Sequence, residues 1–156
     1  SITVADLLKA IIIRPFSPSD QTAAKTLIQT GLGERFGFVD DTLNPDIDAI
    51  SVNYLEQGAI FIVAERDGQV VGTGALVQET AVAGRIVRVS VAKKYWGMGI
   101  GRSITEYLIE NGRAIGYEQI FVETNEDWHD AIHLYKRCGF QPFDRRNGEI
   151  HMQLNL

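Results

Sequence analysis

A glycine-rich segment between Tyr95 and Ser103 holds the residues whose types and spacing most clearly permit chemistry. Glycines stand at positions 97, 99 and 101, after a β-rich run over residues 86–91 and before an amphipathic segment. Glycines let the backbone turn tightly and leave its N–H groups uncovered. The positive end of a following helix dipole attracts anions. The segment therefore predicts an anion site with phosphate as the usual occupant, and a plain turn between strand and helix is the structural alternative.

Two nucleotide-binding motifs can be compared with this segment by their spacing. A P-loop ends in Gly-Lys-Ser/Thr, whereas here Gly101 is followed by Arg102 and Ser103, which excludes that motif. A dinucleotide fingerprint requires G-x-G-x-x-G/A, and the pattern that begins at Gly97 has Arg102 at its last position. The chain keeps one feature of the fingerprint, an acid at Glu123 about twenty residues further on. Dinucleotide binding therefore stays open as an alternative.

A second segment, His129-Asp130-Ala131-Ile132-His133, resembles the H-E-x-x-H zinc motif with aspartate in place of glutamate. Two histidines at this spacing share one face of a helix, as a zinc site requires. However, the aspartate is shorter than the usual glutamate base, and His151 is the only other histidine in the chain. Chance spacing on an exposed helix explains the pattern better, so we predict that the protein holds no metal.

The composition limits the class of protein. The chain of 156 residues has the length of a single domain, residues 1–156, and can bury a substantial core. A net charge of -5 and the lack of a Lys/Arg run argue against a nucleic-acid partner. The longest apolar run, residues 58–64, is too short to span a membrane. Because Cys138 is the single cysteine, a reducing compartment is favoured, and we expect a cytoplasmic protein without a membrane partner.

The elements that position the glycine segment follow from hydrophobic periodicity. Residues 86–91 are mostly β-branched and show little helical periodicity, which predicts a strand. After the glycines, apolar residues from Ile100 to Ile115 recur at helical spacing, and Gly116 is expected to end that helix. A second strand is predicted over residues 119–123. Because a helix separates the two strands, we expect them to be parallel neighbours in a right-handed crossover.

The remaining elements complete a mixed α/β sheet with helices packed on it. The Asp67-Gly68 and Asn147-Gly148 pairs predict two hairpins in an otherwise antiparallel sheet. Residues 1–10 show no clear period and receive no assignment. The other predicted elements are a strand over residues 11–14, a helix from Ser19 or Asp20 to about Gly31, a helix from Asn44 to near Gly58, strands over 59–66, 69–79 and 81–91, a helix between Asn125 and Gly139, and strands over 141–145 and 149–156.

A long connection is predicted from Gly31 to Pro45. Glycines, phenylalanines and acids alternate in it, and its length exceeds that of most connections in compact domains. Aromatic and acidic side chains together suit a pocket for an amine with an apolar body. The connection is therefore a candidate for recognising a substrate, and an irregular loop with only a structural role is the alternative.

Three stretches of the sequence together resemble one known family. They are Val89-Ser90-Val91, the segment Tyr95-Trp96-Gly97-Met98-Gly99-Ile100-Gly101, and the run Ala131-Ile132-His133-Leu134-Tyr135-Lys136-Arg137-Cys138-Gly139-Phe140. Their separation, and the element order over nearly the whole chain, resemble the GNAT superfamily of N-acetyltransferases. The resemblance implies a GNAT-like α/β fold with a mostly antiparallel sheet, one parallel strand pair that splays apart, and flanking helices.

The resemblance also implies acetyl-CoA as co-substrate, bound where the parallel strands separate. On this basis the backbone of Val89, Ser90 and Val91 pairs with the pantetheine arm and orients the acetyl carbonyl. The pyrophosphate is held by backbone N–H groups of Gly97, Met98, Gly99, Ile100, Gly101 and Arg102. Tyr135 stands at the position of the family's general acid.

The implied reaction transfers an acetyl group to a primary amine of a small molecule or a protein. The amine attacks the thioester directly, so no enzyme nucleophile is needed, and backbone donors can stabilise the oxyanion. Because the reference pKa of a thiol is about 8.5 and that of a phenol about 10, Tyr135 can return a proton to the leaving thiolate. Glu79, Glu123 or a water relay can take the proton of the amine, and the sequence does not choose among them.

Two tryptophans depart from the family pattern. Trp96 stands where Arg or Gln usually begins the glycine motif, and Trp128 replaces an asparagine three residues before Ala131. The first change removes a charged side chain near the phosphates, and the second removes a polar contact to the CoA arm. A CoA-binding or nucleotide-binding sensor without catalysis is the alternative function. A homodimer is a family-level expectation, and the identity of the amine is not determined by the sequence.

Overall fold

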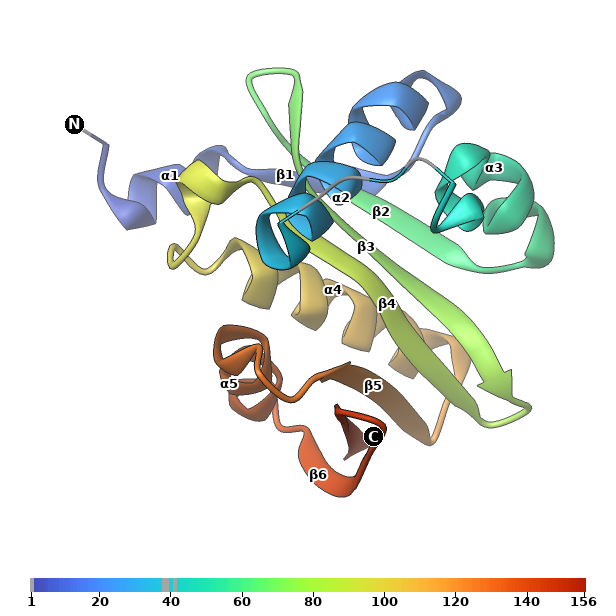
Figure 1. Cartoon of the computed structure of the whole chain (residues 1–156). Coiled ribbons are helices and arrows are strands. Elements are labelled where there is room, and N and C mark those ends of the chain that lie inside the picture. Colours follow the sequence, from blue (N-terminus) through green and yellow to red (C-terminus); the bar gives the residue numbers. More distant parts are fainter. Residues whose placement is uncertain (1, 38–39, 41) are drawn as a thin grey trace.

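A seven-stranded sheet forms the centre of the molecule, with helices packed against it (Figure 1). The computed structural model describes residues 2–37, 40 and 42–156. The strands are β1 (Ile12–Pro15), β2 (Ile60–Arg66), β3 (Gln69–Thr80), β4 (Ala83–Val91), β5 (Gln119–Asn125), β6 (Gln141–Arg146) and β7 (Glu149–Asn155), in the order β1-β2-β3-β4-β5-β7-β6 across the sheet. The helices are α1 (Val4–Ala10), α2 (Gln21–Phe36), α3 (Ile50–Asn53), α4 (Ile100–Ile115) and α5 (His129–Arg137).

Strands β4 and β5 form the one parallel pair of the described sheet, and all other neighbours are antiparallel. Their pairing covers residues 83–85 and 119–121 only. Beyond it, β4 continues to Val91 and β5 to Asn125 while the two strands diverge. Figure 1 shows α5, β5 and β6 set apart from β4 on this side. The predicted mixed sheet with one splayed parallel pair is therefore confirmed.

Two apolar clusters hold α2 and α4 against the strands. Ile104 and Leu108 of α4 are fully buried, and a Cβ at Gly74 of β3 would lie only 2.6 Å from Ile104 Cγ2, so this glycine lets the helix approach the sheet closely. Ala24 and Ile28 of α2 are buried in the second cluster, beside side chains of α3 and β2. Burial of this apolar surface fixes both helices next to the strands that border the opening.

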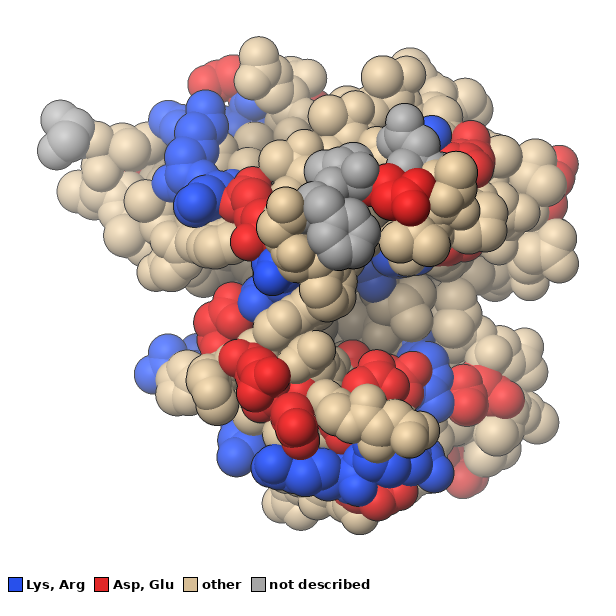
Figure 2. Space-filling view, viewed as in Figure 1, with Lys and Arg blue, Asp and Glu red and all other residues tan. Residues whose placement is uncertain are grey.

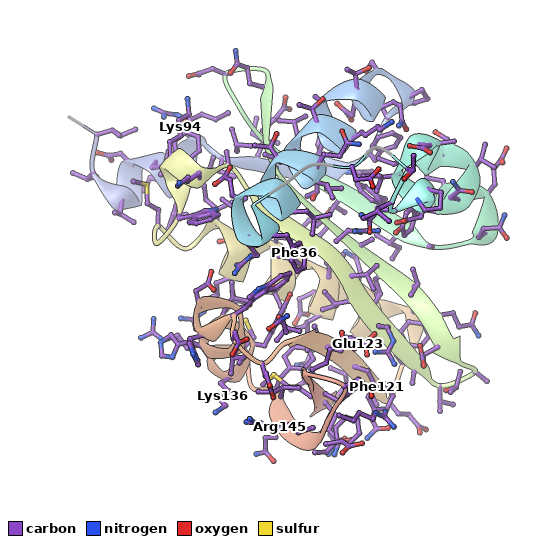
Figure 3. The ribbon with its side chains drawn as sticks, in the orientation of Figure 1. Phe36, Lys94, Phe121, Glu123, Lys136 and Arg145 are labelled. Atoms are coloured by element: carbon purple, nitrogen blue, oxygen red, sulfur yellow. The ribbon has the colours of Figure 1, made fainter. Side chains whose placement is uncertain are left out.

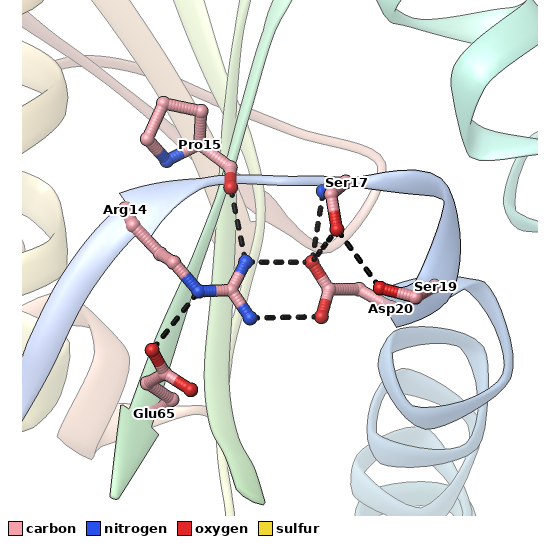
Figure 4. A network of polar contacts seen from close by, with 6 residues as sticks. All are labelled: Arg14, Pro15, Ser17, Ser19, Asp20 and Glu65. Atoms are coloured by element: carbon pink, nitrogen blue, oxygen red, sulfur yellow. Dashed lines mark hydrogen bonds and ion pairs between the residues drawn. The ribbon is translucent and has the colours of Figure 1, made fainter. Parts of the chain in front are cut away.

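A polar network fixes the start of α2 (Figure 4). The guanidinium of Arg14 in β1 donates to both carboxylate oxygens of Asp20 at 2.7 and 2.9 Å, and to Glu65 of β2 at 3.0 Å. Asp20 also accepts a hydrogen bond from the backbone N–H of Ser17 at 2.8 Å. The hydrogen bonds from Arg14 lower the pKa of the buried Asp20 carboxyl. The network therefore stays charged at neutral pH and anchors the helix that reaches the opening between β4 and β5.

Helix α2 is longer than the sequence predicts. The prediction that it ends near Gly31 is wrong, because it continues to Phe36 and is closed by Gly37 in the left-handed conformation, with φ of 81°. The connection predicted to begin at Gly31 is correspondingly shorter, and part of it lies outside the described residues. Gly31 stays within the helix because it permits close packing on β4, where a Cβ would lie 2.9 Å from Ser90 Oγ.

The single helix predicted from Asn44 to near Gly58 is also wrong. The chain there forms three short turns, η2 (Pro45–Asp48), α3 and η3 (Leu55–Gln57). Ala49 interrupts them with φ of -147° and ψ of 82°. The side chain of Asn44 does not cap a helix, because its Oδ1 accepts a hydrogen bond from Arg88 Nη2 at 3.0 Å. A tertiary contact thus replaces the predicted cap.

The remaining predictions of secondary structure are confirmed, with shifts at the ends of elements. Both hairpins are present, and Asp67-Gly68 and Asn147-Gly148 have positive φ as their tight turns require. Helix α1 forms where the sequence allows no assignment. Ile115, expected on the buried stripe of α4, is instead exposed. Within the described ranges, no helix combines the length and apolar character needed to cross a membrane.

Candidate active site

A cavity of about 880 Å³ occupies the opening between β4 and β5. Its wall is formed by α2, β4, the turn before α4, β5 and α5, together with Asp46 and Tyr54 from the segment before β2. Figure 2 shows the corresponding hollow across the middle of this face of the molecule. The cavity therefore lies where the two strands splay apart, beside the glycine segment.

Along β4 the cavity wall is a strand edge without a strand partner. In the part of the chain that the structure describes, β4 pairs with β5 only as far as Arg85. Val89, Ser90 and Val91 lie beyond that point and line the cavity. Backbone N–H and C=O groups along such an edge take their partners from solvent or from a ligand, except the carbonyl of Val91, which accepts a hydrogen bond from Trp96 Nε1. An extended ligand can therefore pair with this edge as an added strand does.

The glycine turn at the end of β4 has the conformation that the sequence predicts. Gly97 and Gly99 have φ of 77° and 89°, a region that favours glycine, and α4 begins at Ile100. A Cβ at Gly101 would lie 2.7 Å from a leucine of α5, so this glycine lets the two helices meet. The three glycines line the cavity together with Ile100 and Arg102. The positive end of the α4 dipole thus lies at the cavity wall.

Two side chains of this turn differ in their surroundings. Met98 packs against the apolar cluster of α4 and, alone among the predicted cofactor residues, is not part of the cavity wall. Arg102 is half-exposed, and its Nε donates to Glu106 Oε1 at 2.8 Å. Since the predicted role of the segment requires backbone N–H groups, neither placement argues against it.

Tyr135 lies on α5 and reaches the cavity wall from the side opposite β4. Its side chain is buried and packs edge-on against Phe140, with ring centroids 5.8 Å apart. The turn after α5 fixes this pair, because Gly139 has φ of 100° and the N–H of Phe140 donates to the carbonyl of Tyr135 at 3.0 Å. Burial raises the pKa of the Tyr135 hydroxyl above its usual range. The phenol is therefore protonated at neutral pH, as a proton donor must be.

The structure separates the two acids that the sequence leaves as candidate bases. Glu123 of β5 lines the cavity, with Oε2 3.2 Å from His151 Nδ1 and Oε1 3.4 Å from Arg85 Nη1 (Figure 3). Glu79 is not part of the wall. Both of its oxygens accept hydrogen bonds from Arg85 at 2.9 Å, and these bonds lower the pKa of its carboxyl. Of these two acids, only Glu123 is therefore placed to meet a ligand in the cavity.

Arg35 of α2 contacts both of the tryptophans that depart from the family pattern. Its guanidinium lies 4.4 Å from the centroid of the Trp128 ring and 5.8 Å from that of Trp96, and it binds both oxygens of Asp130 at 2.7 and 3.1 Å. The hydrogen bonds from Arg35 lower the pKa of the Asp130 carboxyl. The indole Nε1 of Trp96 in turn donates to the carbonyl of Val91 at 2.7 Å. These contacts link α2, the glycine turn and α5 across the cavity wall.

Sequence reasoning missed Arg35, Asp46, Tyr54 and Arg88 as residues of the cavity wall. Arg35 lies in a stretch that was predicted to be a loop. Of these four, only Arg88 could have been found from the sequence, because a charged residue is unusual within a β-branched run. The other two come from short turns whose position depends on tertiary contacts.

The described residues do not support the zinc motif on α5. His129 and His133 belong to no group of three metal-ligating side chains, and Asp130 is engaged by Arg35. A different group, Glu123, Glu149 and His151, has ligand atoms within 4.8 Å of one another. Arg85 contacts Glu123 Oε1 and Arg146 Nε lies 3.3 Å from His151 Nε2, so guanidinium groups already contact two of these three residues.

Curated proteins of similar sequence are N-acetyltransferases. N-acetyltransferase 8 of Rattus norvegicus is 32% identical over 123 residues, which cover 75% of this chain and 54% of the rat protein. The chain spans about half the length of the rat relatives that it matches. Residues 24–140 match the model of the acetyltransferase (GNAT) family.

Solved structures share the fold. The acetyltransferase of the GNAT family from Staphylococcus aureus has a TM-score of 0.86 at 22% identity, over 94% of this chain and 99% of that chain. A protein of Salmonella typhimurium, yncA, was solved with its cofactor acetyl-CoA and has a TM-score of 0.79 at 21% identity, over 94% of each chain. Because the family match spans most of the chain and the splayed strands, glycine turn and α5 motif all lie around one cavity, this chain belongs to the acetyltransferase (GNAT) family.

Proposed function

We propose that the cavity binds acetyl-CoA and transfers its acetyl group to a primary amine of a small molecule or a protein. The observation that carries the proposal is the unpaired edge of β4, which leads into the glycine turn at the start of α4. The backbone of Val89 to Val91 pairs with the pantetheine arm, and N–H groups from Gly97 to Arg102 hold the pyrophosphate. The acetyl-CoA of the yncA structure supports this choice of cofactor.

The reaction is a direct displacement. The free amine attacks the thioester carbonyl, a C–N bond forms, and the C–S bond to CoA breaks. Backbone N–H groups of β4 stabilise the oxyanion that develops in between. The leaving thiolate takes a proton from the hydroxyl of Tyr135, whose raised pKa keeps the phenol protonated until that step.

The proton of the attacking amine goes to Glu123 or to a water that it binds. Glu123 is the one acid of the two candidates that lines the cavity, and its oxygens lie 3.4 Å from Arg85 Nη1 and 3.2 Å from His151 Nδ1. A carboxylate at this place also attracts the cationic form of the amine before it loses its proton. A small-molecule amine and a protein amine both satisfy this chemistry, and a cytoplasmic location and a homodimer remain predictions.

The test is release of CoA thiol in the presence of a panel of amines, with mass spectrometry of the products. We expect an amine that gains one acetyl group and an equal amount of free thiol. Saturable binding of acetyl-CoA with no acetylated product from any amine would instead favour the non-catalytic sensor. A chain that binds no acetyl-CoA would contradict the proposal itself.

A further inference from the structure

Arg88 has an unusual backbone at the point where β4 passes the cavity. Its φ is +58°, in the left-handed region that residues other than glycine rarely adopt. On β3, Thr73 and Ala75 pair with Ser90 and Val87, so β4 carries one extra residue between these pairs. The hydroxyl of Thr73 donates to the carbonyl of Arg88 at 2.8 Å and holds the bulge in place. Strained backbone of this kind is concentrated at functional sites.

The bulge aims the Arg88 side chain at the segment before β2. Its Nε and Nη2 donate to the two oxygens of Asp46 at 2.9 and 2.6 Å, and Nη2 also donates to Asn44 Oδ1. The hydroxyl of Tyr54 donates to the same carboxylate. These contacts fix the plane of the guanidinium. Among the described residues these hydrogen bonds use Nε and Nη2, so the two N–H groups of Nη1 are the donors left for a further acceptor.

The surroundings of Arg88 match one kind of ligand. Arg88 and Asp46 pair with each other and line the same cavity as Glu123. A ligand there can place an ammonium group toward the carboxylate of Glu123 and a carboxylate group toward the Arg88 N–H groups that Asp46 does not bind. The rest of this part of the wall includes apolar side chains, among them Leu32 and Val77, which suit an apolar body.

We propose that Arg88 binds a carboxylate of the acetyl acceptor, so that the acceptor is a primary amine that also carries a carboxylate on an apolar body, as an apolar amino acid does. This inference rests on the proposed function and narrows its substrate class. Asp46 and Asn44 act as positioning residues that orient Arg88. The amine then lies toward Glu123 and the carboxylate toward Nη1 of Arg88.

The test compares phenylalanine, phenylalaninamide and phenethylamine as acceptors at saturating acetyl-CoA. We expect kcat/KM for phenylalanine to exceed that of the other two by about tenfold or more, the size expected for a charged hydrogen bond. The amide has a less basic amine, and a larger fraction of it is unprotonated. For the amide, basicity alone therefore predicts the opposite order, so the comparison of phenylalanine with phenylalaninamide isolates the carboxylate.

Arg88→Met should reduce the preference, the ratio of kcat/KM for phenylalanine to that for each of the other two acceptors, to near one. The Kd of acetyl-CoA should stay the same. Arg113→Met, which removes an arginine that pairs with Glu110 on the surface of α4, is the matched control and should keep the preference. Equal kcat/KM for the three acceptors in the wild-type protein would overturn the inference whether or not the Arg88 variant folds. A preference that survives in a folded Arg88→Met variant would overturn it as well.

The same assay distinguishes this inference from the proposed function. If none of the three acceptors is acetylated but a peptide amine is, the carboxylate inference fails and the proposed function stands. If no amine in the wider panel is acetylated, the proposed function itself fails, and the carboxylate inference fails with it.

Discussion

The proposed cofactor end of the cavity presents backbone groups, whereas the proposed acceptor end presents charged side chains. At the cofactor end, the edge of β4 and the N–H groups of the glycine turn form the wall within one continuous stretch, residues 89–102. At the acceptor end, Asp46, Arg88 and Glu123 come from three separate segments. A backbone site tolerates many changes of side chain, because its donors belong to every residue. A side-chain site depends on the identity of each residue and on the fold that brings them together.

This difference explains why the unusual Trp96 is compatible with a cofactor site. Replacing a polar or charged residue there leaves the glycine turn unchanged, with φ of 77° at Gly97 and 89° at Gly99. The indole contributes a hydrogen bond to the carbonyl of Val91 and a ring that faces Arg35. The following predictions test the contrast between the two ends, from the largest expected effect to the smallest.

Tyr135→Phe removes the proposed proton donor, which lines the cavity from α5. We expect turnover to fall by about 10²- to 10⁴-fold, the usual contribution of general acid catalysis, because the thiolate must then leave without a proton from the enzyme. The Kd of acetyl-CoA should not change. Steady-state thiol release and a binding titration measure the two quantities. An unchanged rate would remove Tyr135 from the mechanism.

Gly99→Ala tests the backbone end. An alanine with φ near 89° is strained by about 1–2 kcal/mol, so the turn should shift and the Kd of acetyl-CoA should rise about tenfold. The KM of the amine should stay constant. Gly148→Ala is the matched control, because Gly148 also has positive φ, at 74°, and lies in the turn between β6 and β7 with open space around a Cβ. Equal effects of both variants on Kd would show that the glycine turn does not hold the cofactor.

Asp46→Asn tests the side-chain end through its dependence on pH. Burial alone would raise the pKa of Asp46, but hydrogen bonds from Arg88 and Tyr54 outweigh it and lower the pKa. A lowered pKa in the folded state contributes stability above the unfolded pKa of about 3.9, and this contribution is lost as the pH falls through the folded pKa.

The variant should therefore be less stable than the wild type by about 1 kcal/mol at pH 7, after allowing for partial exposure. The difference should shrink as the pH falls below about 4. Urea unfolding over a pH series measures it. Glu110→Gln, in an exposed pair with Arg113, should show almost no difference at any pH. A constant difference at all pH values would mean that the charge of Asp46 has no stabilising role.

Arg35→Met should have the smallest effect on substrate binding, although Arg35 contacts both Trp96 and Trp128. Its ion pair with Asp130 is largely exposed on the acid side, and such pairs contribute about 0.2–1 kcal/mol. The cation–π contact with Trp128 adds about 0.5–1 kcal/mol. We expect a small decrease in Tm and changes of less than about threefold in the KM of either substrate. A selective loss of acetyl-CoA binding would instead place Arg35 in the cofactor site.

Local sequence patterns predict the parts of this molecule that depend on local structure. The glycine turn, the helix after it, both hairpins and the parallel pairing of β4 and β5 follow from residue type and spacing, whereas the splay of that pair follows from the family resemblance, and all are present. The glycine at position 31 misled the prediction for α2, because its close contact with Ser90 favours a helix that local propensity does not. The turns after Asn44 likewise depend on a hydrogen bond from Arg88, far along the chain.

The residues of the site also divide into those that local sequence predicts and those that depend on tertiary contacts. Nine of the ten predicted site residues line the cavity, since they lie in two short motifs, and Met98 is the exception. Arg35, Asp46 and Arg88 have no common motif and meet only through the packing of α2 and the short turns against β4. Glu123 could be separated from Glu79 only once the positions of both relative to the cavity were known.

The most direct test of the central claim is a calorimetric titration of the whole chain with acetyl-CoA, with NAD and zinc as controls. The account predicts saturable binding of acetyl-CoA with one site per chain and no comparable response to NAD or zinc. No binding of acetyl-CoA, or binding of NAD or zinc alone, would contradict the assignment of the β4 edge and the glycine turn to acetyl-CoA.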